Sequence, residues 1–230
     1  MDLIEKEVKG RRVLLREGEK NAPLVLLATS QKGLLQLPEI LQLADEGLQG
    51  RSYHFAAFCC DSWDDDYSPW AAEAISGENS FSGKGTDTLA WISEALIADL
   101  RRFLFFDDIF IVGYSLAGLF SLWAGYESHL FSGCGCCSGS LWFSGWESYA
   151  NAHQLLRQGR GDLSLGGKEE KSSDPIMATI GAVTRRQATL LAKDSSVTAS
   201  KLEMNPGGHF SANEKRLAKA IVWLLSGNKM

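Results

Sequence analysis

Residues 110–125 read FIVGYSLAGLFSLWAG, and this stretch decides the fold. An apolar run typical of a buried strand changes at Ser115 into an apolar run with helical spacing. Small residues surround the serine at Gly113, Ala117 and Gly118. A sharp strand-to-helix turn needs such neighbours, because larger side chains would collide there. We therefore interpret the stretch as a nucleophile elbow that exposes the Ser115 hydroxyl. The alternative is a helix N-cap serine beside packing glycines.

Apolar runs of strand length alternate with helical patterns on both sides of this elbow. The expected strands are RRVLLRE (11–17, the outer one), PLVLLATS (23–30), SYHFAAFCC (52–60), IFIVGY (109–114), SGCGCCSGS (132–140), DLSLGG (162–167) and VTASKLEM (197–204). The expected helices lie within 34–47, 86–104, 115–128, 147–158, 175–193 and 212–226. This alternation predicts an α/β fold with a mostly parallel central sheet and helices on both faces. No shift in composition marks a linker, so we expect residues 1–230 to form a single domain.

The composition is that of an ordinary globular protein, with 45% hydrophobic and 22% charged residues. The net charge of -5 and the lack of a Lys/Arg cluster argue against nucleic acid or an anionic membrane surface as the partner. A small molecule is the expected partner. Neither a signal peptide nor an apolar run of membrane-spanning length is visible, which predicts a cytoplasmic location. The sequence leaves the oligomeric state open.

The cysteines are odd in number and crowded into two apolar segments: Cys59, Cys60, Cys134, Cys136 and Cys137. This pattern suits buried thiols better than a secreted disulfide framework. The CxCC run at 134–137 lacks the second ligand pair of a structural zinc site. We therefore expect no metal site.

One segment, residues 61–85, interrupts the regular alternation of strands and helices. It is rich in acidic residues, Ser and Gly, and carries four aromatic residues: Trp63, Tyr67, Trp70 and Phe81. A loop of this length in a compact domain is typically functional or disordered, and the aromatic content favours an ordered lid. The alternative is a packed surface loop.

A serine nucleophile needs a base, and the chain contains four histidines. His54 falls inside a strand, His153 inside a helix, and His129 just past the helix that Ser115 opens. His209 instead follows the last strand, in NPGGHFSANE (205–214), where two glycines let the backbone bend over the sheet edge. His209 is therefore the expected base.

The imidazole in turn needs a carboxylate, and the segment after the preceding strand, DLSLGGKEEKSSDP (162–175), offers Glu169, Glu170 and Asp174. Adjacent residues point in different directions, so only one of the two glutamates can face His209. Glu169 is the first acid after the glycine pair and has the shorter path back over the sheet. Asp174, just before Pro175, is expected to cap a helix.

These residues carry a resemblance to a known group of proteins. With GYSLAG (113–118), LSLGGKEE (163–170) and GGHF (207–210), the chain resembles the α/β-hydrolase esterases that include esterase D, feruloyl esterases, siderophore esterases and mycolyltransferases. The likeness runs from residue 23 to the closing helix. It implies an α/β-hydrolase fold and a Ser-His-acid hydrolase or acyltransferase without metal or redox cofactor.

Matched to those motifs, Ser115 would be the nucleophile, His209 the base and Glu169 the acid. The N–H groups of Leu116 and Ser30 would form the oxyanion hole, although ATSQKG (28–33) stands where relatives often carry His-Gly. A further departure is Ala117 in place of a glycine.

The resulting hypothesis is a serine esterase that hydrolyses a small carboxylic ester through an acyl-enzyme on Ser115. Trp70, in the 61–85 loop, and Trp142 are expected to wall the substrate pocket. A thioesterase or acyltransferase would use the same residues. A non-catalytic binding protein on a hydrolase scaffold is a third possibility, because fold does not dictate function.

Overall fold

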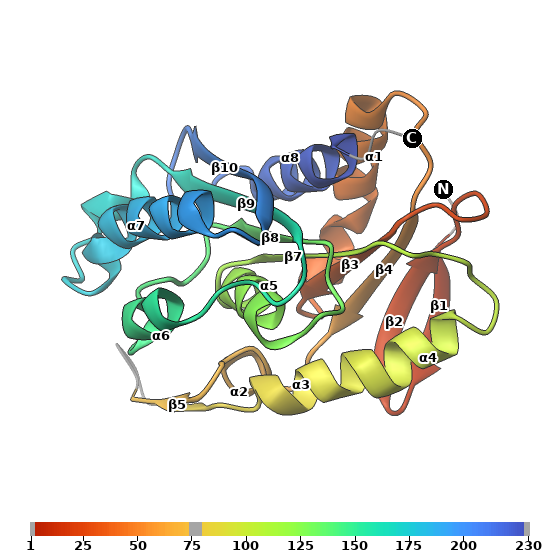
Figure 1. Cartoon of the computed structure of the whole chain (residues 1–230), viewed down its shortest axis with the longest axis horizontal. Helices are drawn as coiled ribbons and strands as arrows, with labels where there is room; N and C mark the ends of the chain where they lie inside the picture. The colour runs from red at the N-terminus through yellow and green to blue at the C-terminus, as the bar shows by residue number, and fades with distance from the viewer. Residues whose placement is uncertain (1–2, 74–79, 228–230) are drawn as a thin grey trace.

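A computed structural model describes residues 3–73 and 80–227, and an eight-stranded sheet forms its centre (Figure 1). The strand order is β1-β2-β4-β3-β7-β8-β9-β10. The strands of this sheet are β1 (Ile4–Val8), β2 (Arg11–Arg16), β3 (Leu24–Thr29), β4 (His54–Cys59), β7 (Ile109–Tyr114), β8 (Gly133–Cys137), β9 (Gly159–Gly166) and β10 (Val197–Asn205). The neighbouring strands in the series β4-β3-β7-β8-β9-β10 pair in parallel. The pairs β1-β2 and β2-β4 are antiparallel. The predicted mostly parallel α/β fold is thus confirmed.

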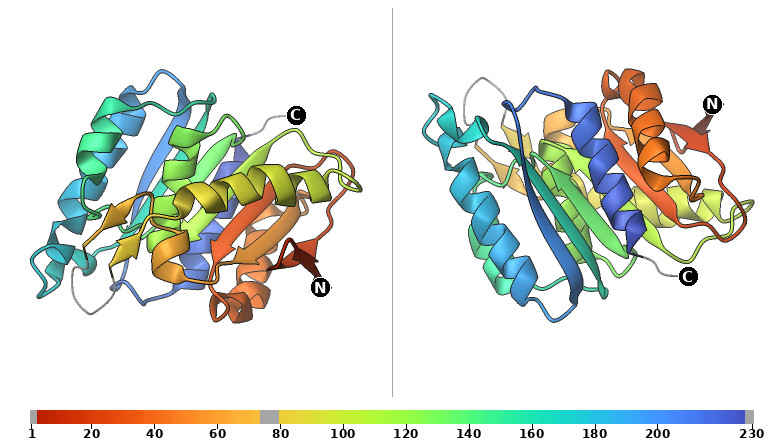
Figure 2. Two further views of the ribbon diagram at one scale, coloured as in Figure 1. Left: turned by 90° about the horizontal axis from the view of Figure 1, so that it is seen from below. Right: turned by 90° about the horizontal axis from the view of Figure 1, so that it is seen from above.

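Helices cover both faces of this sheet (Figure 2). The α-helices are α1 (Leu37–Leu48), α2 (Trp63–Asp66), α3 (Gly85–Trp91), α4 (Ile97–Leu100), α5 (Leu116–Glu127), α6 (Trp146–Ala152), α7 (Ile180–Lys193) and α8 (Asn213–Ser226). A π-helical turn, η2 (Ile92–Leu96), joins α3 to α4, and short 3₁₀ turns are η1 (Gly33–Gln36), η3 (Glu169–Lys171) and η4 (Met177–Thr179). A two-stranded ribbon pairs β5 (Ala71–Ala72) with β6 (Phe81–Ser82).

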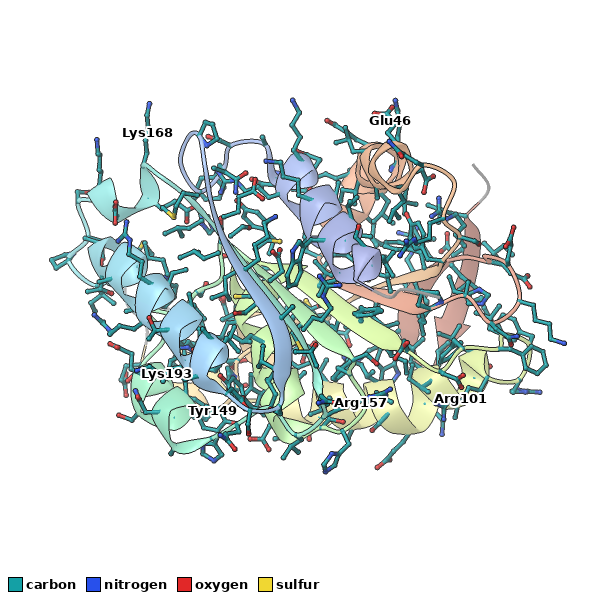
Figure 3. All side chains as sticks on the ribbon, turned by 45° about the horizontal axis from the view of Figure 1, so that its top comes forward. Glu46, Arg101, Tyr149, Arg157, Lys168 and Lys193 are labelled. Atoms are coloured by element: carbon teal, nitrogen blue, oxygen red, sulfur yellow. The ribbon has the colours of Figure 1, made fainter. Side chains whose placement is uncertain are left out.

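The two faces of the sheet bury separate hydrophobic cores. Along β7, Ile109 and Ile111 pack into the core on the α3–α7 side, whereas Phe110 and Val112 pack into the core under α1 and α8. A strand covered on both faces reads as an unbroken apolar run, which explains the sequence IFIV. Figure 3 shows side chains filling these layers, while Glu46 and Lys168 project outward.

The N-terminal hairpin was missed by the sequence analysis. The segment 11–17 was expected to be the outer strand, but β1 pairs with β2 and takes the edge position. Lys9 and Gly10 join the two strands with φ values of 49° and 81°, the positive values that a tight two-residue hairpin requires. Three of the five residues of β1 are charged, and Val8 is its one buried residue. The sequence of β1 therefore shows no apolar periodicity from which a strand could be predicted.

Helix α6 is shorter than the expected helix over residues 147–158. The chain leaves the helix at His153 in an extended conformation. Beyond it, the N–H of Leu155 donates to Asp194 Oδ2 (2.8 Å) and the N–H of Leu156 donates to the carbonyl of Gly125 (3.1 Å). Leu155 is buried, so tertiary contacts override the helical pattern here.

The cysteines are all free and buried, as predicted. In the described ranges 3–73 and 80–227, no cluster of three or more His, Cys, Asp or Glu side chains is placed to hold a metal ion. A membrane-spanning helix is likewise not found among the described helices, none of which is both long and apolar enough. The cytoplasmic location stays a prediction.

The segment 61–85 is described except for residues 74–79, so that part of the predicted lid lies outside the described residues. Tyr67 is fully buried, and its hydroxyl donates to the carbonyl of Thr29 (2.8 Å). The rings of Trp63 and Tyr67 meet edge to face at 5.2 Å, and Phe81 packs on Phe143 at 5.0 Å. The described parts of the segment are thus packed against the body of the fold.

A buried carboxyl in β9 is poorly compensated. Asp162 is 2% exposed, and its cationic partner, Lys201, lies 3.9 Å away. Burial raises the pKa of Asp162 from 3.8 to about 6, against the opposing effect of Lys201. Between pH 3.8 and about pH 6, the folded state therefore keeps a proton on Asp162 that the unfolded state has already released. Stability falls as pH rises through this window, and the full cost is present above about pH 6.

Asp162→Asn should therefore stabilise the protein at neutral pH, because the amide never ionises. The gain in the free energy of unfolding should approach roughly 3 kcal/mol at most above pH 7, and should vanish near pH 4. Urea unfolding at pH 4.5 and pH 7.5 measures both values. A gain of equal size at both pH values would contradict an ionisation effect.

Candidate active site

Ser115 occupies the turn between β7 and α5 in a conformation that few non-glycine residues adopt. Its φ is 58° and its ψ is -123°. The turn is held by the N–H of Ser115, which donates to the carbonyl of Cys137 (3.0 Å), and by the carbonyl of Ser115, which accepts from Ser140 N–H (3.0 Å). A Cβ on Gly113 would lie 2.1 Å from the carbonyl oxygen of Ala117, so only glycine fits there. The predicted elbow is thus present, and it places the Ser115 side chain at the sheet edge.

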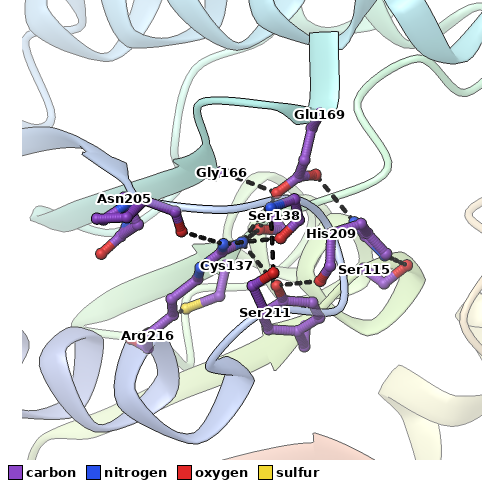
Figure 4. A network of polar contacts seen from close by, with 12 residues as sticks. Ser115, Cys137, Ser138, Gly166, Glu169, Asn205, His209, Ser211 and Arg216 are labelled. Atoms are coloured by element: carbon purple, nitrogen blue, oxygen red, sulfur yellow. Dashed lines mark hydrogen bonds and ion pairs between the residues drawn. The ribbon is translucent and has the colours of Figure 1, made fainter. Parts of the chain in front are cut away.

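His209 lies beside this serine, on the turn between β10 and α8 (Figure 4). The distance from His209 Nε2 to Ser115 Oγ is 3.0 Å. Gly207 has a φ of 86°, which reverses the chain, and the hydroxyl of Tyr114 donates to the backbone carbonyl of His209 (2.6 Å). The two side chains are therefore within hydrogen-bond reach, the distance that a general base would require.

Glu169, on η3, completes the chain of contacts. Its Oε2 lies 2.9 Å from Nδ1 of His209, and its side chain is 5% exposed. The second oxygen, Oε1, accepts from Ser138 Oγ (2.8 Å), from the N–H of Gly166 (2.7 Å) and from Arg216 (2.9 Å). One oxygen is thus free to orient the imidazole because the other is fixed by three donors.

The competing acids lie elsewhere. Glu170 pairs with Arg185 (2.9 Å) on α7. Asp174 Oδ1 accepts from the N–H groups of Ile176 (2.8 Å) and Met177 (3.0 Å) in the turn before η4. The N-cap residues of η4 and α7 are Ile176 and Thr179, so the predicted N-cap role of Asp174 is wrong, although its side chain fixes the turn. Of the three acids that the sequence offered, the structure brings Glu169 to His209.

The Glu169 carboxyl is kept ionised by its donors. Burial alone would raise its pKa, but hydrogen bonds from His209, Ser138 and the Gly166 N–H outweigh that effect and lower it. An ionised carboxylate at this position stabilises positive charge on the ring beside it.

The other histidines are placed away from Ser115. His54 is buried, with Nδ1 accepting from the N–H of Gly18 (2.9 Å). Burial lowers the pKa of His54, which keeps its ring neutral. His153 stacks on Tyr149 at a centroid distance of 4.1 Å, and His129 lies in the loop after α5.

The predicted oxyanion donors are the N–H groups of Leu116, the residue after Ser115, and of Ser30, in the loop after β3. Leu116 is the first residue of α5, and the first N–H groups of a helix have no acceptor within the helix. Ser30 follows β3 and lines the same cleft as Ser115. Its Oγ accepts from the N–H of Gly33 (3.1 Å), which fixes the turn. A further hydroxyl, Ser140 Oγ, lies 3.4 Å from Ser115 Oγ.

A cleft of about 880 Å³ opens over the serine. Its lining residues include Ser30, Lys32, Leu35, Trp63, Ser115, Trp142, Met177, His209 and Phe210. Trp142 therefore lines the cleft as expected. Trp70 does not: its indole N–H donates to the carbonyl of Ser144 (2.8 Å) and its ring packs on Phe143 at 5.8 Å. Trp63, from the same loop, lines the cleft instead.

The sequence analysis missed three residues around the acid: Tyr114, Ser138 and Arg216. Tyr114 occupies the variable position of the elbow, and Ser138 follows β8 with a φ of 43°. Arg216 interrupts the apolar stripe of α8, between positions that pack on the sheet. A cation at an apolar helix position is the one signal that could have identified it.

Comparisons with known proteins bear on the fold. No protein-family model matches the sequence, and no curated protein matches it by sequence. The fold is similar to a solved IroE-like serine hydrolase from Shewanella oneidensis, with 17% identity, a TM-score of 0.83, and coverage of 98% of this chain and 80% of that one. The siderophore hydrolase EstA from Aspergillus nidulans gives 17% identity and a TM-score of 0.74, with coverage of 97% and 93%.

A third solved structure, the enterobactin hydrolase IroE in complex with DFP, shares 17% identity at a TM-score of 0.73, with coverage of 99% and 95%. These likenesses show that the chain has the α/β-hydrolase fold. They also match the resemblance to siderophore esterases drawn from the sequence, at the level of the fold.

Replacement of the two adjacent glutamates should separate their roles. Glu169→Gln should lower kcat on an ester by up to roughly four orders of magnitude, because the imidazole loses its anionic partner. Glu170→Gln, which breaks only the surface pair with Arg185, should leave kcat nearly unchanged. Steady-state kinetics of both purified variants measure the difference. The reverse ranking would assign the acid to Glu170.

Proposed function

We propose that the chain is a serine esterase that hydrolyses a small carboxylic ester through an acyl-enzyme on Ser115. One observation carries the proposal: the pair of contacts from Ser115 Oγ to His209 Nε2 (3.0 Å) and from His209 Nδ1 to Glu169 (2.9 Å). A hydroxyl, an imidazole and a buried carboxylate in this order are the parts of a catalytic triad.

In the acylation step, Ser115 Oγ attacks the ester carbonyl carbon while its proton passes to Nε2 of His209. The carbonyl electron pair moves to oxygen, and the N–H groups of Leu116 and Ser30 stabilise that oxyanion. When the oxyanion collapses, the bond to the leaving alcohol breaks and His209 gives the alcohol its proton. Water then repeats the sequence: His209 takes its proton, the acyl-enzyme is hydrolysed, and Ser115 is regenerated. Side chains and backbone of this chain suffice, so no metal or cofactor is called for.

The structural neighbours support hydrolysis over simple binding, since they include a serine hydrolase and siderophore hydrolases. A binding protein on this scaffold would have no need for the contacts among Ser115, His209 and Glu169. A thioesterase or acyltransferase would use the same three residues and differs in the acyl donor or acceptor.

Apolar side chains at the rim of the cleft favour an ester with an apolar group. Phe210, next to the base, is 90% exposed, and Leu35, on η1, is 81% exposed. Both line the cleft, whose inner wall adds Trp63 and Trp142. An apolar substituent lying against these side chains would remove them from water, which stabilises the complex.

A fluorophosphonate probe tests the proposed nucleophile without knowledge of the substrate. The chain should gain the mass of one phosphonyl group, whereas Ser115→Ala should gain none and should unfold at a similar denaturant concentration. Ser140→Ala is the matched control and should still be labelled. It removes a hydroxyl that lies 3.4 Å from Ser115 Oγ but leaves Ser115 in place. Intact mass spectrometry reads the result. Labelling that survives Ser115→Ala would contradict the serine-hydrolase proposal.

The rim should contribute to chain-length preference among p-nitrophenyl esters. Phe210→Ala should lower kcat/KM by roughly ten- to a hundredfold for an ester long enough to reach the rim, and little for the acetate, because a buried phenyl group is worth about 1.5–3 kcal/mol. Phe105→Ala is the control, since Phe105 is 58% exposed and is not part of the cleft lining. Equal losses on short and long esters would exclude a binding role for Phe210.

A further inference from the structure

A buried arginine lies behind the catalytic residues proposed above. Arg216, on α8, has a side chain that is 1% exposed. Figure 4 shows its guanidinium between the strand ends that carry the site. A buried cation is costly unless it is paired and hydrogen-bonded, so its partners indicate why it is there.

The guanidinium contacts Glu169 and the turn that carries His209. Its NH1 group donates to Glu169 Oε1 (2.9 Å), to Ser138 Oγ (2.6 Å) and to the hydroxyl of Tyr114 (2.8 Å). Its NH2 group donates to the carbonyls of Pro206 (3.2 Å) and Gly208 (2.8 Å), in the turn that carries His209. One planar, rigid group thus ties the acid to the turn of the base.

The carboxylate does not need Arg216 for hydrogen bonding alone. Oε1 of Glu169 also accepts from Ser138 Oγ (2.8 Å) and from the N–H of Gly166 (2.7 Å). A Cβ on Gly166 would lie 2.7 Å from the guanidinium, so the strand end is shaped to admit it. What Arg216 supplies beyond these donors is a formal charge and the link to the 206–208 turn.

The charged and titratable groups around this pair come from several elements. Burial raises the pKa of Tyr114, on β7, to about 12 and also raises the pKa of Cys137, on β8. Both stay neutral near pH 7, and beyond Cys137 lie Asp162 and Lys201 on β9 and β10. Among the described residues, the ion pairs of Glu169 are those with Arg216 and with the His209 ring. Removal of the arginine charge would increase the proton affinity of the Glu169–His209 pair.

We propose that Arg216 is a positioning residue, which holds Glu169 and the His209 turn in register and places a fixed positive charge beside the carboxylate. This inference rests on the proposed Ser-His-Glu chemistry. Arg216 does not touch the substrate or the reacting atoms; it acts through Glu169 and through the backbone around His209.

The test compares Arg216→Met, which removes the charge, with Arg216→Lys, which keeps the charge but not the fork. Arg185→Met is the matched control, because Arg185 pairs with the neighbouring Glu170 on the surface. The measurement is the rate constant for fluorophosphonate labelling of Ser115 between pH 5 and pH 9, read by intact mass. This readout needs no substrate.

The acid limb of the profile is the pH range in which the labelling rate constant falls as the pH is lowered. In Arg216→Met, this limb should move to higher pH by about one unit or more. Its plateau rate should fall at least tenfold. In Arg216→Lys, the limb should stay near its original pH while the plateau falls, because a single ammonium cannot span the acceptors on both sides. Arg185→Met should match the original chain in limb and plateau.

Unchanged limb positions in both Arg216 variants would overturn the inference, since a merely structural arginine would lower the amount of folded protein without moving the limb. Urea unfolding monitors that amount. If Arg216→Met does not fold, an unchanged plateau in Arg216→Lys would overturn the inference by itself. Absence of Ser115 labelling in the original chain would instead overturn the proposed function, so the two failures are distinguishable.

Discussion

The site depends on one backbone constraint, the turn at Ser115. A non-glycine residue with a φ of 58° is strained, and the strain persists only where surrounding structure fixes it. Here the fixing groups are the carbonyl of Cys137 at the end of β8 and the N–H of Ser140 beyond it. The same contacts bring Ser138 and Ser140 close to the serine. The elbow is therefore built by two neighbouring strands, and the serine cannot move without disturbing both.

The parallel sheet brings other side chains close to this turn, because the carboxyl ends of parallel strands lie along one edge. Ser115 follows β7, Glu169 follows β9 and His209 follows β10, and these strands lie in the order β7-β8-β9-β10. The intervening strand, β8, ends at Cys137 and contributes Ser138 as a donor to Glu169. Residues 40 and 94 positions apart in sequence from His209 thus meet within hydrogen-bond distance of it.

The sequence predicts correctly those parts of the fold in which the local hydrophobic pattern agrees with the tertiary structure. The change of period at Ser115 fixed the elbow, and the position of His209 after the last strand separated it from the other histidines. Trp70 was misjudged because an indole in a loop can turn toward the cleft or toward a backbone carbonyl such as that of Ser144, and only packing decides. Arg216 was missed because its partners come from four separate segments of chain, which no local pattern reveals.

Two buried carboxyls on or just after β9 show why burial alone does not mark a functional acid. The cations that act on Asp162, Lys201 at 3.9 Å and Arg160, do not outweigh burial, which raises its pKa to about 6. Glu169, also buried, has a lowered pKa because His209, Ser138 and Gly166 donate to it. In the sequence, Asp162 lies within β9 and Glu169 lies three residues after it, and no local pattern distinguishes the two acids. The difference lies in the donors that other strands bring, so the acid that stays charged is selected by tertiary structure. A buried ionic group of this kind contributes little net stability, so the fold itself does not account for a charged carboxylate at this position.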